Sequence, residues 1–320
     1  MSASHSNTPN AGSSPITTKF VLDTLEYVRT FAGETLLIKL GGAALQDFDL
    51  VVSICRDLAL IRSIGISIVL VHGGGPAINK ELTLHGIDWS FIDGQRVTTE
   101  PMMDIVEMVL SGSVNRRIVR TLNHAGVCAV GISGTDARVL QCRPARAELG
   151  QVGAIEKVDV SFIRTILNTQ TEADEDQKGG MGFIPVIAPV GFGPEGRAMN
   201  VNADWAASHI AAALGIRKII YLTDQEGILG ADGKLASEVD AASLRGFVDA
   251  GVVKGGMLAK TQTILHALKS GVKDVHILNS RRPHCLIEEL FTSQGVGTIC
   301  RGLTAAAITS TKGSEIHGTA

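Results

Sequence analysis

Short apolar segments that alternate with amphipathic segments constrain the fold of this chain more than any other feature. Apolar stretches of strand length cover residues 36–40, 66–71, 128–132, 183–190, 218–222 and 275–278. Most are separated by segments with helical spacing of apolar residues, about 10–15 residues long. This alternation is typical of parallel strands joined by helical crossovers, with helices covering both faces of the sheet. The sequence therefore predicts an α/β fold, an open, mainly parallel αβα sandwich.

Three glycine clusters follow apolar segments of this pattern. Residues 39–42 read Lys-Leu-Gly-Gly, residues 72–76 read His-Gly-Gly-Gly-Pro, and residues 255–260 read Gly-Gly-Met-Leu-Ala-Lys. Glycine lets backbone N–H groups approach an anion, and the N-terminus of a following helix adds a partial positive charge. One such cluster would be explained by a tight turn. Three at the same sheet edge, two of them carrying a lysine, indicate a phosphate-binding site.

Two standard nucleotide-binding motifs do not fit the sequence. The chain has no Gly-x-x-x-x-Gly-Lys-Ser/Thr, and Ile78 occupies the third glycine position of a dinucleotide fingerprint that begins at Gly73. The nine histidines form no His-Glu-x-x-His and none pairs with Cys at metal-ligand spacing. We therefore predict no metal site made by the protein alone, and we expect His72 to be a hydrogen-bonded core residue rather than a base.

Charge and composition argue against several partners. The formal net charge is −3 and no apolar run approaches the roughly 20 residues that span a bilayer, so neither nucleic acid nor a membrane is expected as a partner. Residues 1–17 lack the apolar core of a secretory signal. The five cysteines are scattered and never form Cys-x-x-Cys, as expected for reduced thiols of a cytoplasmic protein. We predict disordered tails at 1–17 and 303–320 and a loop at 170–181.

Two further segments carry polar chemistry. Residues 89–98 are expected to form a hairpin that turns at Asp93-Gly94. Residues 200–204 read Asn-Val-Asn-Ala-Asp and precede an alanine-rich helix that Asp204 would open. A helix cap explains one Asn or Asp. Because one cap needs only one polar side chain, two Asn and one Asp within five residues indicate a further role for this segment.

Taken together, these motifs resemble those of the amino acid kinase superfamily. The motifs are Lys-x-Gly-Gly at 39–42, Val-His-Gly-Gly-Gly-Pro at 71–76, Gly-Gln-Arg-Val-Thr at 94–98, Asn-x-Asn-Ala-Asp at 200–204, Leu-Thr-Asp at 222–224 and Gly-Gly-Met-x-x-Lys at 255–260. Gly-x-Arg-Val-Thr, Asn-x-Asn-Ala-Asp and the Gly-Val-Gly-Thr of residues 295–298 are similar in particular to the acetylglutamate kinase family. The resemblance runs from about residue 20 to residue 300. It implies one kinase domain, residues 33–302, with an acetylamino-acid-binding half (33–190) and an ATP-binding half (191–302).

The resemblance also implies the reaction. It is the ATP-dependent phosphorylation of the side-chain carboxylate of N-acetyl-L-glutamate, the second step of arginine biosynthesis, with Mg²⁺ held mainly by the phosphates of ATP. A glutamate carboxyl group, whose usual pKa is about 4.3, is already ionised at neutral pH and needs no general base. The enzyme must instead stabilise negative charge that spreads over phosphoryl and leaving-group oxygens. Lysines and glycine N–H groups are suited to that task.

Residue roles follow from the same resemblance. Lys39 and Lys260 match the catalytic lysines, and Asp204 matches the carboxylate that orients them. Arg96, helped by Asn200, matches the group that binds the substrate α-carboxylate. The phosphoryl-binding backbone donors correspond to Gly41, Gly42, Gly73, Gly74 and Gly75. The ATP-binding positions are Thr223, Asp224, Gly256 and Lys260.

The segment before the kinase domain suggests regulation. Phe20 to Phe31 forms an amphipathic helix, within residues 18–32, whose apolar face needs a cover. It could pack on its own subunit. The resemblance points instead to arginine-inhibited enzymes, in which such helices interlace to make a hexamer, a trimer of dimers. It then implies an L-arginine site that includes His276, Glu289 and Gly295, although Glu289 could equally be a solvated helix residue.

Other interpretations remain open at this stage. The chain has Thr135 where related kinases often have lysine, Trp205 where they have a smaller or polar residue, and an unusual Gln225-Glu226. A kinase for carrier-bound or acetylated aminoadipate in lysine biosynthesis is the nearest alternative, because one methylene changes binding by only about 1–3 kcal/mol. Carbamate, aspartate, glutamate and UMP kinases are more distant. A non-catalytic arginine-sensing domain and a dinucleotide-dependent oxidoreductase belong to different classes.

Overall fold

The computed structural model describes residues 18–169, 182–230, 232–253, 255–292 and 295–302. The tails and the 170–181 loop expected from the sequence lie outside the described residues. The strands are β1 (Thr35–Leu40), β2 (Ser67–His72), β3 (Phe91–Ile92), β4 (Gln95–Arg96), β5 (Ala129–Ser133), β6 (Leu140–Pro144), β7 (Gly153–Val158), β8 (Ile184–Ala188), β9 (Val190–Phe192), β10 (Ala198–Asn200), β11 (Lys218–Thr223), β12 (Glu238–Asp240), β13 (Asp274–Asn279) and β14 (Thr298–Arg301). The α-helices are α1 (Thr18–Phe31), α2 (Phe48–Ser63), α3 (Gly75–Leu84), α4 (Glu100–Glu107), α5 (Asn115–His124), α6 (Ser161–Asn168), α7 (Ala203–Leu214), α8 (Ala241–Asp249), α9 (Gly256–Lys269) and α10 (Cys285–Phe291).

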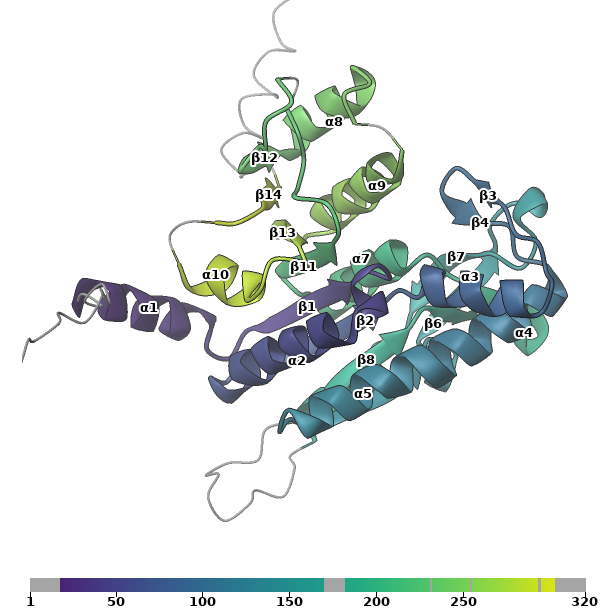
Figure 1. Cartoon of the computed structure of the whole chain (residues 1–320), viewed down its shortest axis with the longest axis horizontal. Coiled ribbons are helices and arrows are strands. Elements are labelled where there is room, and N and C mark those ends of the chain that lie inside the picture. Colours follow the sequence, from purple (N-terminus) through teal and green to yellow (C-terminus); the bar gives the residue numbers. More distant parts are fainter. Residues whose placement is uncertain (1–17, 170–181, 231, 254, 293–294, 303–320) are drawn as a thin grey trace, which may run out of the picture.

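A central eight-stranded sheet organises the molecule, in the order β12-β14-β13-β11-β1-β2-β8-β5. The strands from β13 to β5 are mutually parallel, whereas β14 runs antiparallel to β13. Helices cover the sheet on both sides (Figure 1). The α/β sandwich expected from the alternating pattern is therefore confirmed.

Alternation along β1 divides the core into two layers. Leu36, Ile38 and Leu40 pack in the cluster formed with residues of α2, α5 and α10. Leu37 points to the opposite face and packs in the cluster formed with residues of α7 and α9. Because successive side chains of a strand face opposite ways, Lys39 shares the α7 and α9 face with Leu37. The strand thus delivers one lysine to the layer where α7 and α9 begin.

A smaller sheet, β10-β9-β6-β7, lies beside the central one. The sequence indicated only an irregular region with strands there, and it merged β8 and β9 into one strand. Pro189, between β8 and β9, has no N–H to continue a ladder, so the chain changes sheets at that point. The hairpin β3-β4 turns at Asp93 (φ 50°) and Gly94 (φ 76°). Positive φ at both residues is the two-residue hairpin geometry expected from the Asp-Gly pair.

Residues 100–124 form one continuous helical run. A π-helical segment, Met108–Val114, connects α4 directly to α5. Gly112 and its serine neighbours in this segment are poor helix formers. Burial of Val109, Leu110 and Val114 keeps the segment helical in spite of that preference. The wider π turn lies against the glycine cluster of residues 73–75, since Leu110 lines the same pocket.

Among the described side chains of α1, those near its C-terminal end pack on the same chain. Tyr27, Val28 and Phe31 lie against the core, and the Phe31 ring meets Phe291 of α10 edge to face, with ring centroids 6.3 Å apart. Leu25 and Leu22, about one and two turns before Val28, are each 57% exposed. The option of packing on the same subunit is therefore realised for the last turn of α1 but not for these two leucines.

Smaller expectations can also be compared with the structure. All five cysteines are free thiols and four of them are buried, in agreement with the sequence. None of the described helices is long and apolar enough to cross a membrane.

Candidate active site

An ion triad lies where β1, α7 and α9 meet. Lys39 Nζ lies 2.8 Å from Asp204 Oδ1, and Lys260 Nζ donates a hydrogen bond of 2.7 Å to Asp204 Oδ2. Each lysine side chain is about nine-tenths buried, with 10% and 9% of its surface exposed, and Asp204 is 14% exposed. Sequence reasoning named all three residues, and the fold brings them together.

Local structure explains how each member is held. Lys39 is paired in the sheet with Tyr221 of β11 and Val71 of β2, so its backbone is fixed on both sides. Asn202 is the N-cap of α7, and its Oδ1 accepts hydrogen bonds from the N–H groups of Asp204 and Trp205. The Asn therefore serves as the cap, and the Asp204 carboxylate is left for the lysines.

Burial and the neighbouring charges shift the pKa values of Asp204 and Lys39. Burial alone would raise the pKa of Asp204, but the ammonium groups of Lys39 and Lys260 lower it well below its usual range. Burial lowers the pKa of Lys39, and Lys260 lowers it further, whereas the Asp204 carboxylate raises it. Two cations placed this close need the carboxylate between them. The site therefore presents a net positive charge, with both lysines aimed at one point.

The glycine clusters beside the triad differ in what their N–H groups do. Gly41 N–H donates to Leu222 O, and Gly73 N–H donates to Leu40 O, so both continue the sheet. In the described part of the chain, no acceptor pairs with the N–H groups of Gly42, Gly74 or Gly75. These three groups are the donors left for a ligand.

Glycine is also required there by space. A Cβ on Gly41 would lie 2.7 Å from Leu222 O, and one on Gly42 would lie 2.9 Å from Pro76 Cδ. Both distances are shorter than ordinary contacts. A side chain at Gly41 would therefore push the loop after β1 away from β11, and one at Gly42 would push it away from the second glycine cluster. The loops can approach each other only as bare backbone.

The buried side chain of His72 is hydrogen-bonded to the backbone of the second glycine cluster. It is completely buried, its Nδ1 lies 2.9 Å from Gly73 O, and its Nε2 lies 3.2 Å from Asn115 Nδ2. Nδ1 is thus the donor and Nε2 the acceptor of a neutral ring. Burial lowers the pKa of His72 to about 4. The expectation of a hydrogen-bonded core histidine is confirmed.

A pocket of about 160 Å³ opens next to the triad. Its lining includes Gly73 to Gly75, Arg96 and Asn200. Arg96 is only 6% exposed, its Nη2 donates to Asn79 Oδ1, and its guanidinium carbon lies 4.8 Å from the centre of the Phe91 ring. Its Nη1 is buried and has no protein acceptor within the described residues. Such an orphaned donor suits an anionic ligand.

Sequence reasoning missed the residues that position this pocket. Trp89 and Phe91 lie against the Arg96 guanidinium, and Asn79 accepts its hydrogen bond. Thr98 Oγ1 accepts a 2.9 Å hydrogen bond from Asn200 Nδ2. The Gly-x-Arg-Val-Thr motif contains Thr98, so that signal was available. Asn79 lies in a helix sequence without a recognisable motif, so nothing in the sequence marked it as a site residue.

A second pocket, of about 710 Å³, adjoins the first, because Gly94, Gln95 and Asn202 line both. It also includes Trp205, Gly255 and Gly256, at the start of α9. Gly255 has φ +58°, which an L side chain rarely adopts.

The remaining ATP-binding candidates and the departure at Thr135 lie at the ends of two strands, β11 and β5. Thr223 ends β11, next to β1, and its Oγ1 lies 3.3 Å from Asp224 Oδ1. Asp224 is exposed, and its neighbour Gln225 donates to the same oxygen. Thr135 lies after β5 and donates from Oγ1 to Ser133 Oγ.

The candidates for an arginine site lie elsewhere, between β13 and α10. His276 and Glu289 are buried and hydrogen-bonded to each other through Nδ1 and Oε1. Glu289 Oε2 also accepts a 2.9 Å hydrogen bond from Val296 N, and Gly295 lies beside it. Burial would raise the pKa of Glu289, but His276 lowers it below its usual value. Glu289 is therefore a paired, buried carboxylate and not a solvated helix residue.

No group of three or more His, Cys, Asp or Glu side chains within the described ranges is arranged to hold a metal ion.

Comparison with known proteins agrees with the fold. The Amino acid kinase family matches residues 34–279. The acetylglutamate kinase of Geobacter metallireducens is 42% identical over 282 residues, which cover 88% of this chain and 96% of that protein. The acetylglutamate kinase of Thermoanaerobacter pseudethanolicus is 40% identical over 284 residues, 87% of this chain and 91% of that protein.

Solved structures extend the likeness. N-acetylglutamate synthase from Neisseria gonorrhoeae, complexed with coenzyme A and N-acetyl-glutamate, superposes with a TM-score of 0.78 at 25% identity. The match covers 91% of this chain but only 64% of that longer chain. With a family match over most of its length and relatives above 40% identity, this chain belongs to the amino acid kinase family.

Proposed function

We propose that this protein transfers the γ-phosphoryl group of ATP to the side-chain carboxylate of N-acetyl-L-glutamate, forming N-acetyl-L-glutamyl 5-phosphate in arginine biosynthesis. The observation that carries the proposal is the triad of Lys39, Asp204 and Lys260. Sequence neighbours of the triad line two adjoining pockets: Ala203 the smaller one, and Trp205 and Ala259 the larger one. Curated relatives above 40% identity are acetylglutamate kinases, which supports the same substrate.

Each group of the triad has a role in this reaction. The attacking carboxylate and the γ-phosphate are both anions, so the reaction needs positive charge where they meet. Lys39 would stabilise the phosphoryl oxygens on the acceptor side, and Lys260 the oxygens on the nucleotide side. Asp204 holds both lysine Nζ groups in position, because it contacts each with a separate oxygen. The amides of Gly42, Gly74 and Gly75 would complete the cradle for the phosphoryl group in transfer, with Gly41 and Gly73 permitting the close approach of the loops.

The smaller pocket suits the acetylamino acid. Arg96 offers its unpaired Nη1 and lies beside Asn200, so the substrate α-carboxylate would bind there. The triad then receives the other end of the molecule, where the side-chain carboxylate reacts. This polarity explains why a dicarboxylic amino acid is the preferred acceptor.

The larger pocket suits the nucleotide. It reaches from Trp205 to the N-terminus of α9 at Gly256, where free N–H groups and the helix dipole favour phosphate. Thr223 and Asp224, at the end of β11, would contribute to the same side. Mg²⁺, held mainly by the phosphates, would neutralise charge on the oxygens between the β and γ phosphorus atoms.

Regulation by L-arginine belongs to the same proposal. We propose a hexamer, a trimer of dimers, in which α1 pairs with a neighbour's helix through Leu22 and Leu25, both exposed in the single chain. An arginine guanidinium would bind near Glu289, whose carboxylate has acceptor positions beyond the two already filled by His276 and Val296. A cytoplasmic location is proposed with it.

Alternative functions are tested by one experiment. The intact triad argues against a non-catalytic arginine-sensing domain, and the Arg96 pocket does not by itself distinguish acetylglutamate from the acyl aminoadipate substrate of lysine biosynthesis. A coupled ADP-release assay should compare N-acetylglutamate, N-acetylaminoadipate, aspartate, carbamate and UMP side by side. N-acetylglutamate should give the highest kcat/KM. Higher activity on aminoadipate would reassign the substrate, and no activity on any acceptor would favour the sensing domain.

A further inference from the structure

The hairpin β3-β4 is too short to keep its position unaided. Each of its strands has two residues, and the aromatic side chains beside Arg96 are largely exposed, Trp89 by 40% and Phe91 by 49%. An isolated two-stranded hairpin is at best marginally stable in water. The position of this hairpin at the Arg96 pocket therefore depends on its contacts with the rest of the chain.

Backbone hydrogen bonds attach the base of the hairpin to the turn at residues 147–150. Thr98, which follows β4, donates its N–H to Leu149 O at 3.0 Å and accepts the N–H of Gln151 at 2.7 Å. These two bonds fix the chain where it leaves the hairpin. They do not reach the tip at Asp93 and Gly94.

An ion pair attaches the tip to the same turn. Arg146 Nη1 donates a 2.9 Å hydrogen bond to Asp93 Oδ2, across 53 positions of the chain. Arg146 Nε lies 3.4 Å from Glu148 Oε1, a contact that helps to orient the guanidinium. Among the residues that the structure describes, the Asp93 carboxylate has no second ionic or hydrogen-bonding partner. The Asp93–Arg146 pair is therefore the one charged attachment of the tip within this part of the chain.

The tip also lies against the helix that carries Lys260. A Cβ built on Gly94 would lie 3.8 Å from Ala259 Cβ, which is an ordinary contact distance, and Ala259 directly precedes Lys260. Gly94 lines both the smaller and the larger pocket, and Arg146 lines the larger one. The Asp93–Arg146 pair thus holds the hairpin where the smaller pocket meets the first turn of α9.

From these observations we propose that Arg146 is a positioning residue of the phosphotransfer reaction. It holds the hairpin tip through Asp93 and so keeps Phe91 against the Arg96 guanidinium. This inference rests on the proposed function, in which Arg96 binds the α-carboxylate of the acceptor. Arg146 acts through the hairpin and not on the reacting atoms. It raises the fraction of the protein in which the acceptor pocket is formed, and the apparent affinity for the acceptor follows that fraction.

Initial rates with each substrate varied in turn test this role. Arg146→Gln should raise the KM for N-acetylglutamate about two- to fivefold, because an exposed ion pair, here with side chains 39% and 73% exposed, contributes only modestly. The kcat and the KM for ATP should stay nearly unchanged, since saturating acceptor restores the formed pocket. Arg146→Lys keeps the charge and should keep most of the affinity.

Substitution of the partner tests the ion pair itself. Asp93→Asn removes the negative charge and preserves the turn, because asparagine also adopts a positive φ readily. It should have the same effect as Arg146→Gln, and Asp93→Asn/Arg146→Gln should be no worse than either single variant. The ratio of acceptor KM values between Asp93→Asn and the unsubstituted protein should fall toward one in about 1 M salt, since ions screen an exposed pair. A purely structural effect would not depend on salt in this way.

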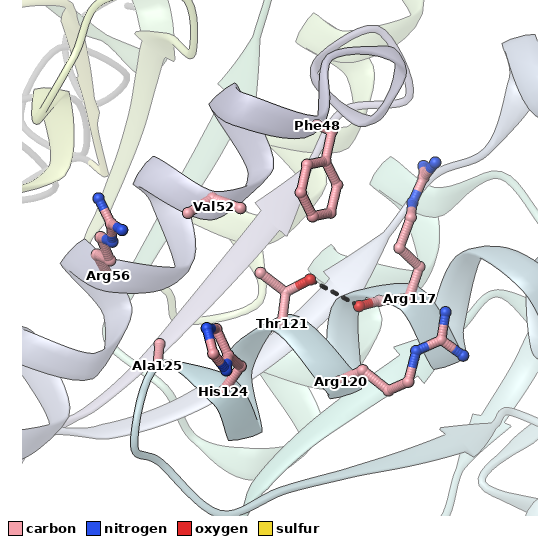
Figure 2. Close-up of a pocket in the computed structure, with 8 residues that line it drawn as sticks. All are labelled: Phe48, Val52, Arg56, Arg117, Arg120, Thr121, His124 and Ala125. Atoms are coloured by element: carbon pink, nitrogen blue, oxygen red, sulfur yellow. Dashed lines mark hydrogen bonds between the residues drawn. The ribbon is translucent and has the colours of Figure 1, made fainter.

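Two other arginines serve as controls. Arg143→Gln breaks another exposed ion pair, which Arg143 of β6 forms with Glu156. Arg120→Gln removes one positive charge from α5, at the groove between α2 and α5 that Figure 2 shows. Both variants should leave the acceptor KM unchanged.

A fluorescence measurement tests the hairpin without any activity. The chain has two tryptophans, Trp89 and Trp205, so Trp205→Phe leaves Trp89, next to the hairpin, as the single tryptophan. In that background and without ligands, acrylamide should quench Trp89 more strongly after Arg146→Gln, and equally strongly before and after Arg143→Gln. This result does not depend on the acceptor that the enzyme uses, so it separates failure of this inference from failure of the proposed function.

Several results would overturn the inference. Unchanged quenching of Trp89 in Arg146→Gln would show that the hairpin needs no such attachment. Increased quenching with an unchanged acceptor KM would show that the hairpin position does not limit acceptor binding. An increase in the KM for ATP alone would place Arg146 in nucleotide binding instead, and additive effects in Asp93→Asn/Arg146→Gln would show that the two residues act separately.

Discussion

Lys260 Nζ lies 2.7 Å from Asp204 Oδ2, although 56 positions separate the two residues in the chain. This contact joins the first turn of α7 to the second turn of α9, and Lys39 of β1 meets the other oxygen of the same carboxylate. One aspartate therefore fixes two cations that come from different elements. The predictions below follow from this geometry and from its surroundings.

Replacing Lys260 by alanine should lower kcat about 10²–10³-fold, because the loss of one positioned donor to a developing charge has an effect of that size. Lys39→Ala should behave in the same way. Lys269→Ala, an exposed lysine on the same helix, is the control and should keep normal kcat. A Lys260→Ala enzyme with near-normal turnover would remove this residue from the mechanism.

Asp204→Asn should reduce both activity and stability. The change leaves two nearly buried ammonium groups without a counter-charge, and breaking one partner of a buried ion pair costs about 3 kcal/mol or more. Urea denaturation measures the loss, and Asp249→Asn on the exposed part of α8 serves as control. Unchanged unfolding midpoints and kcat would mean that the lysines need no aspartate.

Arg96→Lys should raise the KM for N-acetylglutamate and leave the KM for ATP nearly unchanged. A lysine can neither reproduce the planar fork that would face the α-carboxylate nor keep the contact with the Phe91 ring. Initial rates with each substrate varied in turn separate the two constants. An increase in the ATP constant alone would reverse the assignment of the two pockets.

His72 should make stability depend on pH between about 6.5 and 4. Its folded pKa is about 4, below the value of about 6.5 in the unfolded chain, so the unfolded state takes up the proton first. Stability should therefore fall as pH decreases through that range, by up to about 1.4 kcal/mol per pH unit from this group. His72→Gln should lack this part of the pH dependence, as measured by urea unfolding from pH 7.5 to 4.5. His85→Gln, an exposed histidine, is the control, and equal slopes in His72→Gln and the unsubstituted protein would refute the prediction.

Leu22→Asp/Leu25→Asp should convert the proposed hexamer to dimers and abolish inhibition by arginine while leaving kcat intact. The two leucines are exposed and far from the triad, so the substitutions should not disturb folding. Sedimentation velocity and activity with and without millimolar arginine measure both effects, and Glu26→Gln on the same helix is the control. A full-length protein that is dimeric and insensitive to arginine would end the regulatory proposal and leave the kinase proposal untouched.

The sequence predicted the six mutually parallel strands of the central sheet, because they are continuous apolar runs bounded by glycine, but it missed β12 and β14 at the edge. The same reasoning could not resolve β6, β7, β9 and β10. β6 and β7 are half exposed with a weak pattern of apolar residues, and β9 and β10 are only three residues long. Gly112 lies inside the continuous run from α4 to α5, where tertiary packing overrides a local preference.

The candidate site divides in a similar way. Lysines and glycines of the site stand in recognisable motifs, so residue type and spacing were sufficient to name them. The contact of Asn79 with Arg96 and the pair of Asp93 with Arg146 depend on which segments meet, and that is a property of the fold alone.

The ladder between β1 and β11 also sets a distance. Leu40 pairs with Leu222 in register, so the glycine loop after β1 starts beside Thr223, the last residue of β11, with the two strands about 4.8 Å apart. If the acceptor and the nucleotide bind on either side of these two strand ends, the spacing of the hydrogen-bonded strands would set the distance between the two substrates. Backbone hydrogen bonds fix this distance independently of side-chain rotamers. Substitutions of nearby side chains can therefore change the charge between the two strand ends without changing their spacing.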